Sequence, residues 1–255
     1  MTLYLHARDA AADAPVLGDT HAREVMDRID YDFARLDRLR GNQPLIVSRA
    51  KAIDDRVAKF LAEHPDAVVV HLGCGLDSRV LRIDPGPGVA WIDLDQQPVI
   101  ELRRRLYPDR DGVTLIGASV TDSDWSSQVP TGRPTLVVGE GRLMYLSPQG
   151  LRTLVDTIVG RPASTRTLIF DTVARWVARA ARWQPNFREA GTGFTSSTDD
   201  LDAAIRDHRK IVLVEELSMS AAARSVTRGV LGTIIAVLDA VPAGHRSMVL
   251  RTYRA

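Results

Sequence analysis

The stretch Val68-Val69-Val70-His71-Leu72-Gly73-Cys74-Gly75-Leu76-Asp77-Ser78-Arg79 joins an apolar run to two closely spaced glycines. The run 68–72 is typical of a buried strand, and the glycines predict a tight turn into a helix. A glycine has no Cβ, so a ligand can approach its backbone, and the N–H groups that open the next helix point at the same place. The stretch predicts a nucleotide-binding α/β domain, with a purely structural glycine turn as the alternative.

The charge beside this turn narrows the kind of ligand. A dinucleotide would place its pyrophosphate at the start of the helix, where Asp77 would repel it. The same carboxylate favours a cationic ligand such as S-adenosylmethionine, which carries an ammonium and a sulfonium group. Capping of the helix is the structural alternative for Asp77.

The composition is that of an ordinary soluble globular chain. The 255 residues are 45% hydrophobic and 25% charged, which suits one large α/β domain. The net charge of +1 creates no field that would attract nucleic acid or a membrane surface. A single cysteine excludes an internal disulfide and a cysteine metal cluster, and we predict no metal site. No segment resembles a signal peptide or a membrane span, so we expect a cytoplasmic protein.

Two helices are expected before the first strand. Asp19 can cap a helix that ends at Gly41, and a second helix follows Pro44 and ends before His64. One apolar stripe in each supports them: Ala22, Met26, Ile29, Phe33 and Leu36 in the first, and Ile46, Ala50, Ile53, Val57 and Phe60 in the second. A doubly wound sheet does not need these helices, so residues 1–65 are predicted to cover its ligand face.

The rest of the chain alternates strands and helices within a single domain, 1–255. Strands are expected at 68–72, 89–95, 113–116, 135–138, 167–170, 211–214 and 248–253. This order predicts a Rossmann-like, doubly wound α/β fold whose sheet core spans 66–255. Ligands then bind at the carboxyl ends of the strands, where Gly73, Asp95, Ser119 and Glu140 fall. Substrate-side insertions are expected at about 172–200 and 218–245.

Several motifs in this order resemble one enzyme family. They are 72–79, the acids of 93–95, 117–122 with Trp125, Glu140-Gly141 with 144–146, and upstream 29–33 and 49–55. Together they resemble the leucine carboxyl methyltransferase family of class I S-adenosylmethionine-dependent methyltransferases, and within it the bacterial polyketide O-methyltransferases of the tetracenomycin type. The resemblance is clear from about residue 19 to 160 and implies a seven-stranded class I methyltransferase sheet.

The resemblance also implies a set of cofactor-binding residues. They are Arg49, Gly73, Cys74, Gly75, Asp95, Ser119, Val120 and Glu140. Arg49 would pair with the methionyl carboxylate, Asp95 would accept from both ribose hydroxyls, and Glu140 would lie near the methionyl amino group. Ser119 and Val120 would frame the adenine, and the residues of the glycine turn would approach the methionyl part.

The function expected is O-methylation of a small molecule, on a carboxyl or hydroxyl group of an aromatic, polyketide-like natural product. Two alternatives remain open: a methyltransferase for a protein C-terminal carboxylate, and a regulatory module that binds the cofactor without catalysis. A carboxylate is already ionised near neutral pH, whereas a phenol needs a base. No base is convincing in the sequence, although His6 and His21 lie in the cover and could reach a substrate, so a carboxyl acceptor is slightly favoured.

The second half of the chain is expected to contribute the residues that contact the substrate. Trp176 and Trp183 are expected on a basic helix, with Phe187 and Phe194 in the loop that follows. Aromatic groups there would suit a flat aromatic substrate, and a helix packed by its tryptophans is the structural alternative. The small apolar residues of 220–238 have helical spacing and could form core or a homodimer face.

Overall fold

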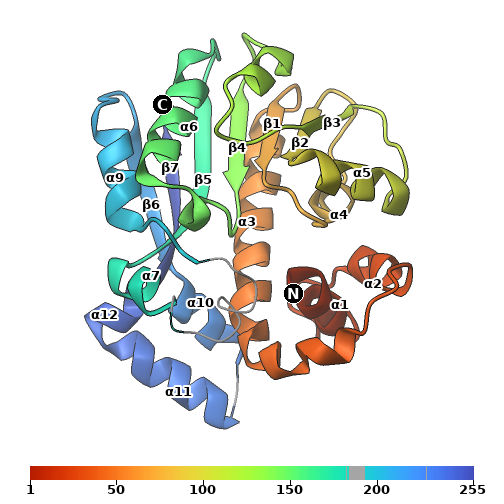
Figure 1. Cartoon of the computed structure of the whole chain (residues 1–255), viewed down its shortest axis with the longest axis vertical. Helices are drawn as coiled ribbons and strands as arrows, with labels where there is room; N and C mark the ends of the chain where they lie inside the picture. Colours follow the sequence, from red (N-terminus) through yellow and green to blue (C-terminus); the bar gives the residue numbers. More distant parts are fainter. Residues whose placement is uncertain (182, 184–192, 228) are drawn as a thin grey trace.

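A computed structural model of the chain describes residues 1–181, 183, 193–227 and 229–255. At its centre lies one seven-stranded sheet with the strand order β3-β2-β1-β4-β5-β7-β6 (Figure 1). The strands are β1 (Val68–Leu72), β2 (Ala90–Asp95), β3 (Val113–Gly117), β4 (Thr135–Gly139), β5 (Arg166–Val173), β6 (Val212–Ser218) and β7 (Met248–Arg254). All neighbours pair in parallel except β7, which is antiparallel to β5 and β6. The predicted class I methyltransferase sheet is confirmed.

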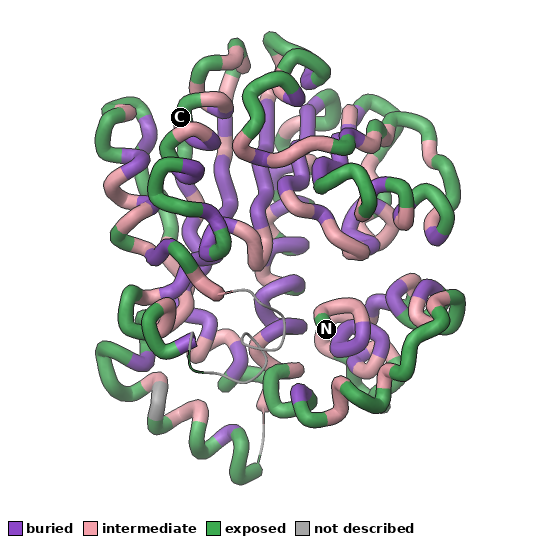
Figure 2. The backbone as a smooth tube through the Cα atoms, viewed as in Figure 1, coloured by how far each residue is buried: buried purple, intermediate pink, exposed green. Residues whose placement is uncertain are grey.

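The central strands are buried on both faces, as their continuous apolar runs predict (Figure 2). Side chains of β1 alternate between two cores: Val68 and Val70 face one, and Val69 faces the other. Helices α3 (Gln43–Glu63) and α10 (Met219–Val226) fill the core on the Val69 side. Helices α6 (Pro148–Gly160) and α9 (Thr198–Arg206) fill the opposite one, together with η2 (Asp124–Gln128).

Two helix boundaries follow the local signals in the sequence. The Ser147 hydroxyl accepts a hydrogen bond from the Gly150 N–H at 3.0 Å and so caps α6. Helix α3 begins beside Pro44 and ends before His64, and its five predicted apolar positions are all buried. Helix α5 (Gln97–Leu106) packs against β2 and β3.

The prediction of one helix from Asp19 to Gly41 is wrong. Helix α2 (Thr20–Asp27) ends early, and a 3₁₀ helix η1 (Phe33–Asn42) follows after a turn. The Asp32 carboxylate accepts from the Ala34 N–H, which lets the side chain compete with a continuous helix for backbone donors. A further helix, α1 (Thr2–Ala10), was not expected from the sequence.

The N-terminal helices lie beyond the carboxyl ends of the central strands, not on a face of the sheet. In Figure 1, α1 and α2 lie past the point of the β4 arrow, across from α4 (Arg79–Ile83). Asp19, the cap of α2, accepts a hydrogen bond from the Ser78 hydroxyl just before α4 at 2.5 Å. Their action as a cover over a ligand stays a prediction.

The two expected insertions are partly helical. The first contains α7 (Arg175–Ala181), and the second contains α10, α11 (Gly229–Ala240) and α12 (Pro242–His245). Trp176 is 51% exposed and Trp183, beyond the end of α7, is 75% exposed, so the tryptophans do not pack this helix into a core. Phe187 lies outside the described residues. Among the helices described, none combines the length and apolar character needed to cross a bilayer.

Ile53 tests the packing of α3 against the sheet. Its side chain is fully buried in the core beside Val69, so Ile53→Ala should lower the free energy of unfolding by about 2–5 kcal/mol. Urea unfolding followed by circular dichroism measures this change. Lys59→Ala, on the exposed side of the same helix, is the matched control and should change the midpoint little. Equal midpoints for the two variants would contradict the packing described.

Candidate cofactor site

Four predicted site residues stand in a row along the carboxyl edge of the sheet. Ser119 follows β3, Asp95 ends β2, Gly73 follows β1 and Glu140 follows β4, and these strands are neighbours in that order. Backbone hydrogen bonds fix adjacent ends together: the Gly73 N–H donates to the Leu94 carbonyl at 2.7 Å. The structure therefore brings together groups that are far apart in the sequence, as the topology predicts.

The glycine turn after β1 needs glycine at both positions. Gly73 has φ +62° and Gly75 has φ +52°, a left-handed region in which a side chain is strained. Helix α4 begins only at Arg79 and has five residues, so its N–H groups do not start directly at the turn. Cys74 between the glycines is buried, and burial raises the pKa of its thiol, which stays protonated.

Asp95 is held in a fixed orientation by backbone donors. Its carboxylate accepts from the Gly75 N–H at 2.8 Å and from the Gln96 N–H at 2.7 Å. A carboxylate has about four acceptor positions, so capacity remains for ligand hydroxyls. On the neighbouring strand, the Ser119 hydroxyl is hydrogen-bonded to Thr121 at 2.8 Å, and Val120 is buried.

Arg49 on α3 joins two carboxylates of the protein. Its Nε donates to Glu140 at 2.9 Å and its Nη1 donates to Asp171 at the same distance, and all three side chains are buried. Asp171 also accepts from the Gly141 N–H at 2.6 Å. Burial raises the pKa of Asp171, which the Arg49 guanidinium partly offsets. The predicted contact of Arg49 with a cofactor carboxylate stays a prediction.

Arg79 joins more elements than any other side chain described in this cluster. Its guanidinium contacts Asp54 on α3 at 2.7 Å, Asp77 in the turn at 3.0 Å, and Glu140 after β4. It also bonds His71 Nε2 at 3.1 Å. An arginine can only donate, so Nε2 accepts, and Nδ1 of His71 donates to Asp93 at 3.2 Å. His71 is thus a satisfied core histidine, as its mid-strand position predicts.

Burial and the neighbouring positive charges shift the pKa of Glu140 in opposite directions. Burial alone would raise its pKa, but the guanidiniums of Arg49 and Arg79 outweigh this effect and hold the pKa well below its usual range. Glu140 is therefore a fixed anion at neutral pH. The pKa of Asp77 is likewise lowered against the effect of burial, chiefly by Arg79 and Arg82.

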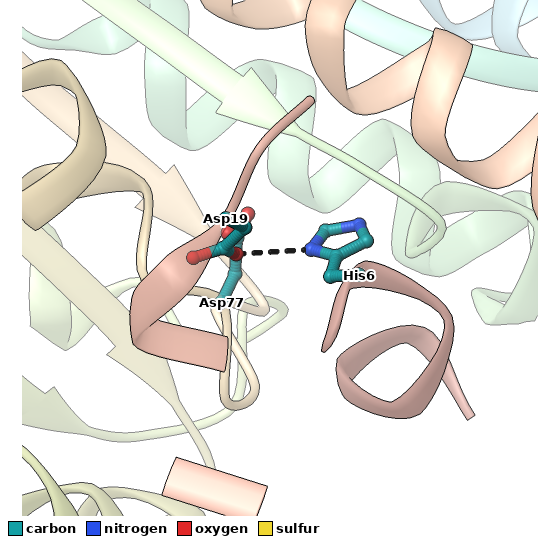
Figure 3. Close-up of side chains that lie close together, drawn as sticks. All are labelled: His6, Asp19 and Asp77. Atoms are coloured by element: carbon teal, nitrogen blue, oxygen red, sulfur yellow. Dashed lines mark hydrogen bonds and ion pairs between the residues drawn. The ribbon is translucent and has the colours of Figure 1, made fainter. Parts of the chain in front are cut away.

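His6, Asp19 and Asp77 form a compact group at the edge of this cluster (Figure 3). Nδ1 of His6 donates to Asp19 at 3.2 Å, and in the described part of the chain Nε2 is buried without a partner. The three side chains could in principle hold a metal ion, but Arg82 Nη1 already lies 2.8 Å from Asp19 and 3.0 Å from Asp77. That guanidinium supplies the cation between the carboxylates, so the group does not favour a metal.

The buried cluster carries more negative than positive charge. Its six carboxylates belong to Asp19, Asp54, Asp77, Asp93, Glu140 and Asp171, and its four guanidiniums to Arg49, Arg79, Arg82 and Arg103. Beside it, Asp95 adds a further carboxylate and Arg142, which lies against Gly73, adds a further guanidinium, so the negative charge remains in excess. Uncompensated buried charge is costly, so the site fits a ligand that brings positive charge. The ammonium and sulfonium groups of S-adenosylmethionine meet that requirement.

Comparison with known proteins agrees with this geometry. Residues 7–159 match the model of the leucine carboxyl methyltransferase family. The chain belongs to the leucine carboxyl methyltransferase family. It is 45% identical over 193 residues to the tetracenomycin polyketide synthesis O-methyltransferase TcmP of Streptomyces glaucescens, a match that covers 76% of this chain and 71% of that protein. The S-adenosyl-L-methionine-dependent methyltransferase dpfgK of Gibberella zeae is 38% identical over 62% of this chain and 58% of its own length.

Solved structures show the same fold. A Thermobifida fusca protein assigned as a methyltransferase has a TM-score of 0.60 at 17% identity, covering 98% of this chain and 93% of that one. The geranyl diphosphate C-methyltransferase of Streptomyces coelicolor has a TM-score of 0.52 at 14% identity, with 99% and 97% covered. By family and fold, this leucine carboxyl methyltransferase family member is an S-adenosylmethionine-dependent methyltransferase.

Sequence reasoning missed part of the site. Asp171 ends the apolar run of β5, the same signal that marks Asp95, and could have been found from it. Asp54 is an acid on the apolar stripe of α3, which also singles it out. Arg82 and Arg142 carry no comparable local signal. Asp77 and Arg79, only two residues apart, form an ion pair at 3.0 Å.

Asp95 tests the proposed ribose contact. Loss of a buried hydrogen bond to a charged group costs roughly 1.5–3 kcal/mol, so Asp95→Ala should weaken S-adenosylmethionine binding about ten- to a hundredfold. Isothermal titration measures the affinity, and a thermal melt checks the fold, because the Gly75 N–H loses its acceptor. Asp111→Ala, an exposed acid after α5, is the control. Unchanged affinity in a folded Asp95→Ala protein would remove Asp95 from the site.

The lowered carboxyl pKa values predict that the folded protein loses stability at acid pH. Glu140 and Asp77 stay ionised in the folded protein below their ordinary pKa values of 4.5 and 3.8. Their stabilising effect is complete above those values and is lost as pH falls toward the lower folded ones. The urea midpoint should therefore fall steeply below about pH 4.5. Glu140→Gln should flatten this dependence, and an equally steep curve in that variant would refute the contribution of Glu140.

Proposed function

We propose that this enzyme transfers the methyl group of S-adenosylmethionine to an oxygen atom of a small, aromatic, polyketide-like molecule. The observation that carries the proposal is the row of Ser119, Asp95, Gly73 and Glu140 along the carboxyl edge of the sheet. The polyketide O-methyltransferase TcmP, 45% identical over most of both chains, supports the acceptor class.

Each residue of this row would contact a different part of the cofactor. Asp95 would accept from the ribose hydroxyls, and Ser119 and Val120 would frame the adenine. Gly73 would allow the methionyl part to approach the backbone, and Glu140 would accept from its ammonium group. When bound, S-adenosylmethionine supplies an electrophilic methyl group on a sulfonium. The protein contributes chiefly by aligning donor and acceptor, which in general removes several kcal/mol from the barrier.

The candidate acceptor site is a cavity lined by residues of α7 and of 194–200. It has a volume of about 420 Å³ and lies between α7 and the segment that leads into α9. Phe194, Arg179 and Ser196 are in its lining, and Ser196 donates to the Leu143 carbonyl in η3 (Leu143–Tyr145), shortly after Glu140. The Phe194 ring meets Tyr145 edge to face with centroids 5.2 Å apart. Aromatic and cationic groups suit a flat acceptor that carries an acidic group.

His6 supports a hydroxyl acceptor. When His6 is neutral, its Nδ1–H donates to Asp19, and this tautomer presents Nε2 as a proton acceptor. The sequence alone offered no convincing base and slightly favoured a carboxyl acceptor. The buried His6–Asp19 pair supplies the base that a phenol requires, and we therefore favour a hydroxyl.

The pH profile of methyl transfer tests both the function and the base. Aromatic acids and phenols would be screened for methylation by mass spectrometry, and the rate would then be measured at saturating acceptor. With His6 as base, the rate should rise with pH to a plateau, and His6→Ala should remove the plateau. His21→Ala, a half-exposed histidine of the same cover, is the control and should keep it. A rate that is flat from pH 6 to 9 would instead indicate a carboxylate acceptor.

The assembly and location of the enzyme are also proposals. Helix α11 exposes Val230, Ile234 and Val237, which supports a homodimer formed through the second insertion. Sedimentation would measure the oligomeric state, and a monomer at micromolar concentration would count against it. A cytoplasmic location remains the expectation from the sequence.

A further inference from the structure

The side chain of Arg142 lies against the first glycine of the turn after β1. A Cβ built on Gly73 would stand 2.7 Å from Cδ and 2.8 Å from Cγ of Arg142, and 3.2 Å from its Nε. Arg142 itself follows β4 and directly precedes η3, so its side chain crosses from the end of one strand to the end of its neighbour. A positive charge is thus present beside the turn that the methionyl part of the cofactor is proposed to approach.

Tyr145 connects Arg142 with the candidate acceptor cavity. Burial raises the pKa of the Tyr145 hydroxyl, and the guanidiniums of Arg49 and Arg142 act against this rise, so both lie near that hydroxyl. The Tyr145 ring in turn meets the ring of Phe194 edge to face, and Phe194 lines the cavity. Arg142 therefore lies between the glycine turn and the place proposed for the acceptor.

The charge of Arg142 is not neutralised by the protein. Its Nε is buried without a hydrogen bond, and Arg142 takes part in no ion pair among the described residues. Buried polar nitrogens are nearly always bonded, so an unmet donor beside a ligand site calls for an explanation. The neighbouring guanidiniums differ, because Arg49 donates to two carboxylates and Arg79 contacts three. Arg142 is thus available to an anion brought by a ligand.

The charged groups of the cofactor have other partners. The family resemblance assigns the methionyl carboxylate to Arg49, which uses only two of its five N–H donors on Glu140 and Asp171. Glu140, a fixed anion, is the proposed partner of the ammonium group. The sulfonium is positive and repels a guanidinium. The ligand left to supply an anion for Arg142 is the methyl acceptor.

We propose that Arg142 is a specificity-determining residue that pairs with an acidic oxygen of the methyl acceptor, close to the oxygen that is methylated. The acceptor is thereby narrowed to a flat aromatic molecule that carries a carboxylate or a second acidic hydroxyl beside the methylated position. This proposal rests on the proposed function and leaves the cofactor contacts of Arg49 and Glu140 unchanged. It accounts for the buried, unpaired Nε of Arg142 beside Gly73.

Two aromatic probes that differ only in an acidic group provide the test. A hydroxynaphthoate whose carboxylate neighbours its hydroxyl, and the corresponding naphthol, would be titrated into enzyme saturated with S-adenosylhomocysteine, which has no methyl group to transfer. Methionine keeps an unbranched apolar stem over Gly73 and removes the charge. Arg142→Met should bind the hydroxynaphthoate about ten- to a hundredfold more weakly, because a charge-assisted hydrogen bond is lost. It should bind the naphthol and S-adenosylmethionine as wild type does.

Two further variants serve as controls. Arg142→Lys keeps the positive charge and should recover part of the loss. Arg23→Met, on the exposed face of α2, removes an arginine far from the turn in sequence and should bind both probes as wild type does.

The outcomes separate this proposal from the one on which it rests. Equal weakening of both probes by Arg142→Met, or weakening of neither, would overturn the role of Arg142 and leave the acceptor class standing. A loss of S-adenosylmethionine affinity in the same variant would place Arg142 on the cofactor and overturn the proposal. If wild-type enzyme bound S-adenosylhomocysteine but neither probe, the proposed acceptor class would be wrong, and the role of Arg142 with it.

Discussion

The arrangement of this site depends on the burial of Arg79. Its guanidinium is inaccessible to solvent, and moving such a charge out of water is expensive unless it is paired and fully hydrogen-bonded. Asp54, Asp77 and Glu140 provide that pairing from a helix, a turn and a strand end. Removing one partner of a buried pair generally costs about 3–5 kcal/mol, because the other charge is left uncompensated. Arg79 therefore fixes the distance between α3, the glycine turn and β4, which carry the residues proposed to contact the methionyl part of the cofactor.

The burial of these charged side chains also bears on the ligand charge that the site would favour. Four guanidiniums are not enough to neutralise six carboxylates, and the imbalance lies at the carboxyl edge of the sheet, beside the left-handed glycines. A sulfonium brings compensating charge, whereas the thioether product of methyl transfer does not. Opposite charges interact more strongly in a poorly hydrated site than in water. In the proposed complex, the electrostatic part of binding would therefore favour S-adenosylmethionine over its thioether product.

Local patterns in the sequence were sufficient for the sheet and for the row of strand ends. The apolar runs set the strands, and parallel topology then forces residues such as Asp95 and Glu140 onto one edge. The N-terminal helices were harder to predict, because the apolar stripe continues through 28–32, whereas α2 ends at Asp27 and the Asp32 carboxylate caps the separate helix η1. Ion pairs such as Arg82 with Asp19 span 63 residues, and no periodicity encodes a partner at that distance. These pairs become visible only when the fold is known.

Family resemblance identifies a residue type at a position, but the number of donors that remain free decides what that residue can bind. A guanidinium has five N–H donors in a fixed plane. In Arg49 the Nε and Nη1 directions are taken by Glu140 and Asp171, and Asp171 in turn is held by the Gly141 N–H. These two bonds use two of the five donors, so Arg49 can hold Glu140 and Asp171 in place and still donate to a cofactor carboxylate through its remaining N–H groups. The contact that the resemblance implies therefore requires no protein hydrogen bond to break.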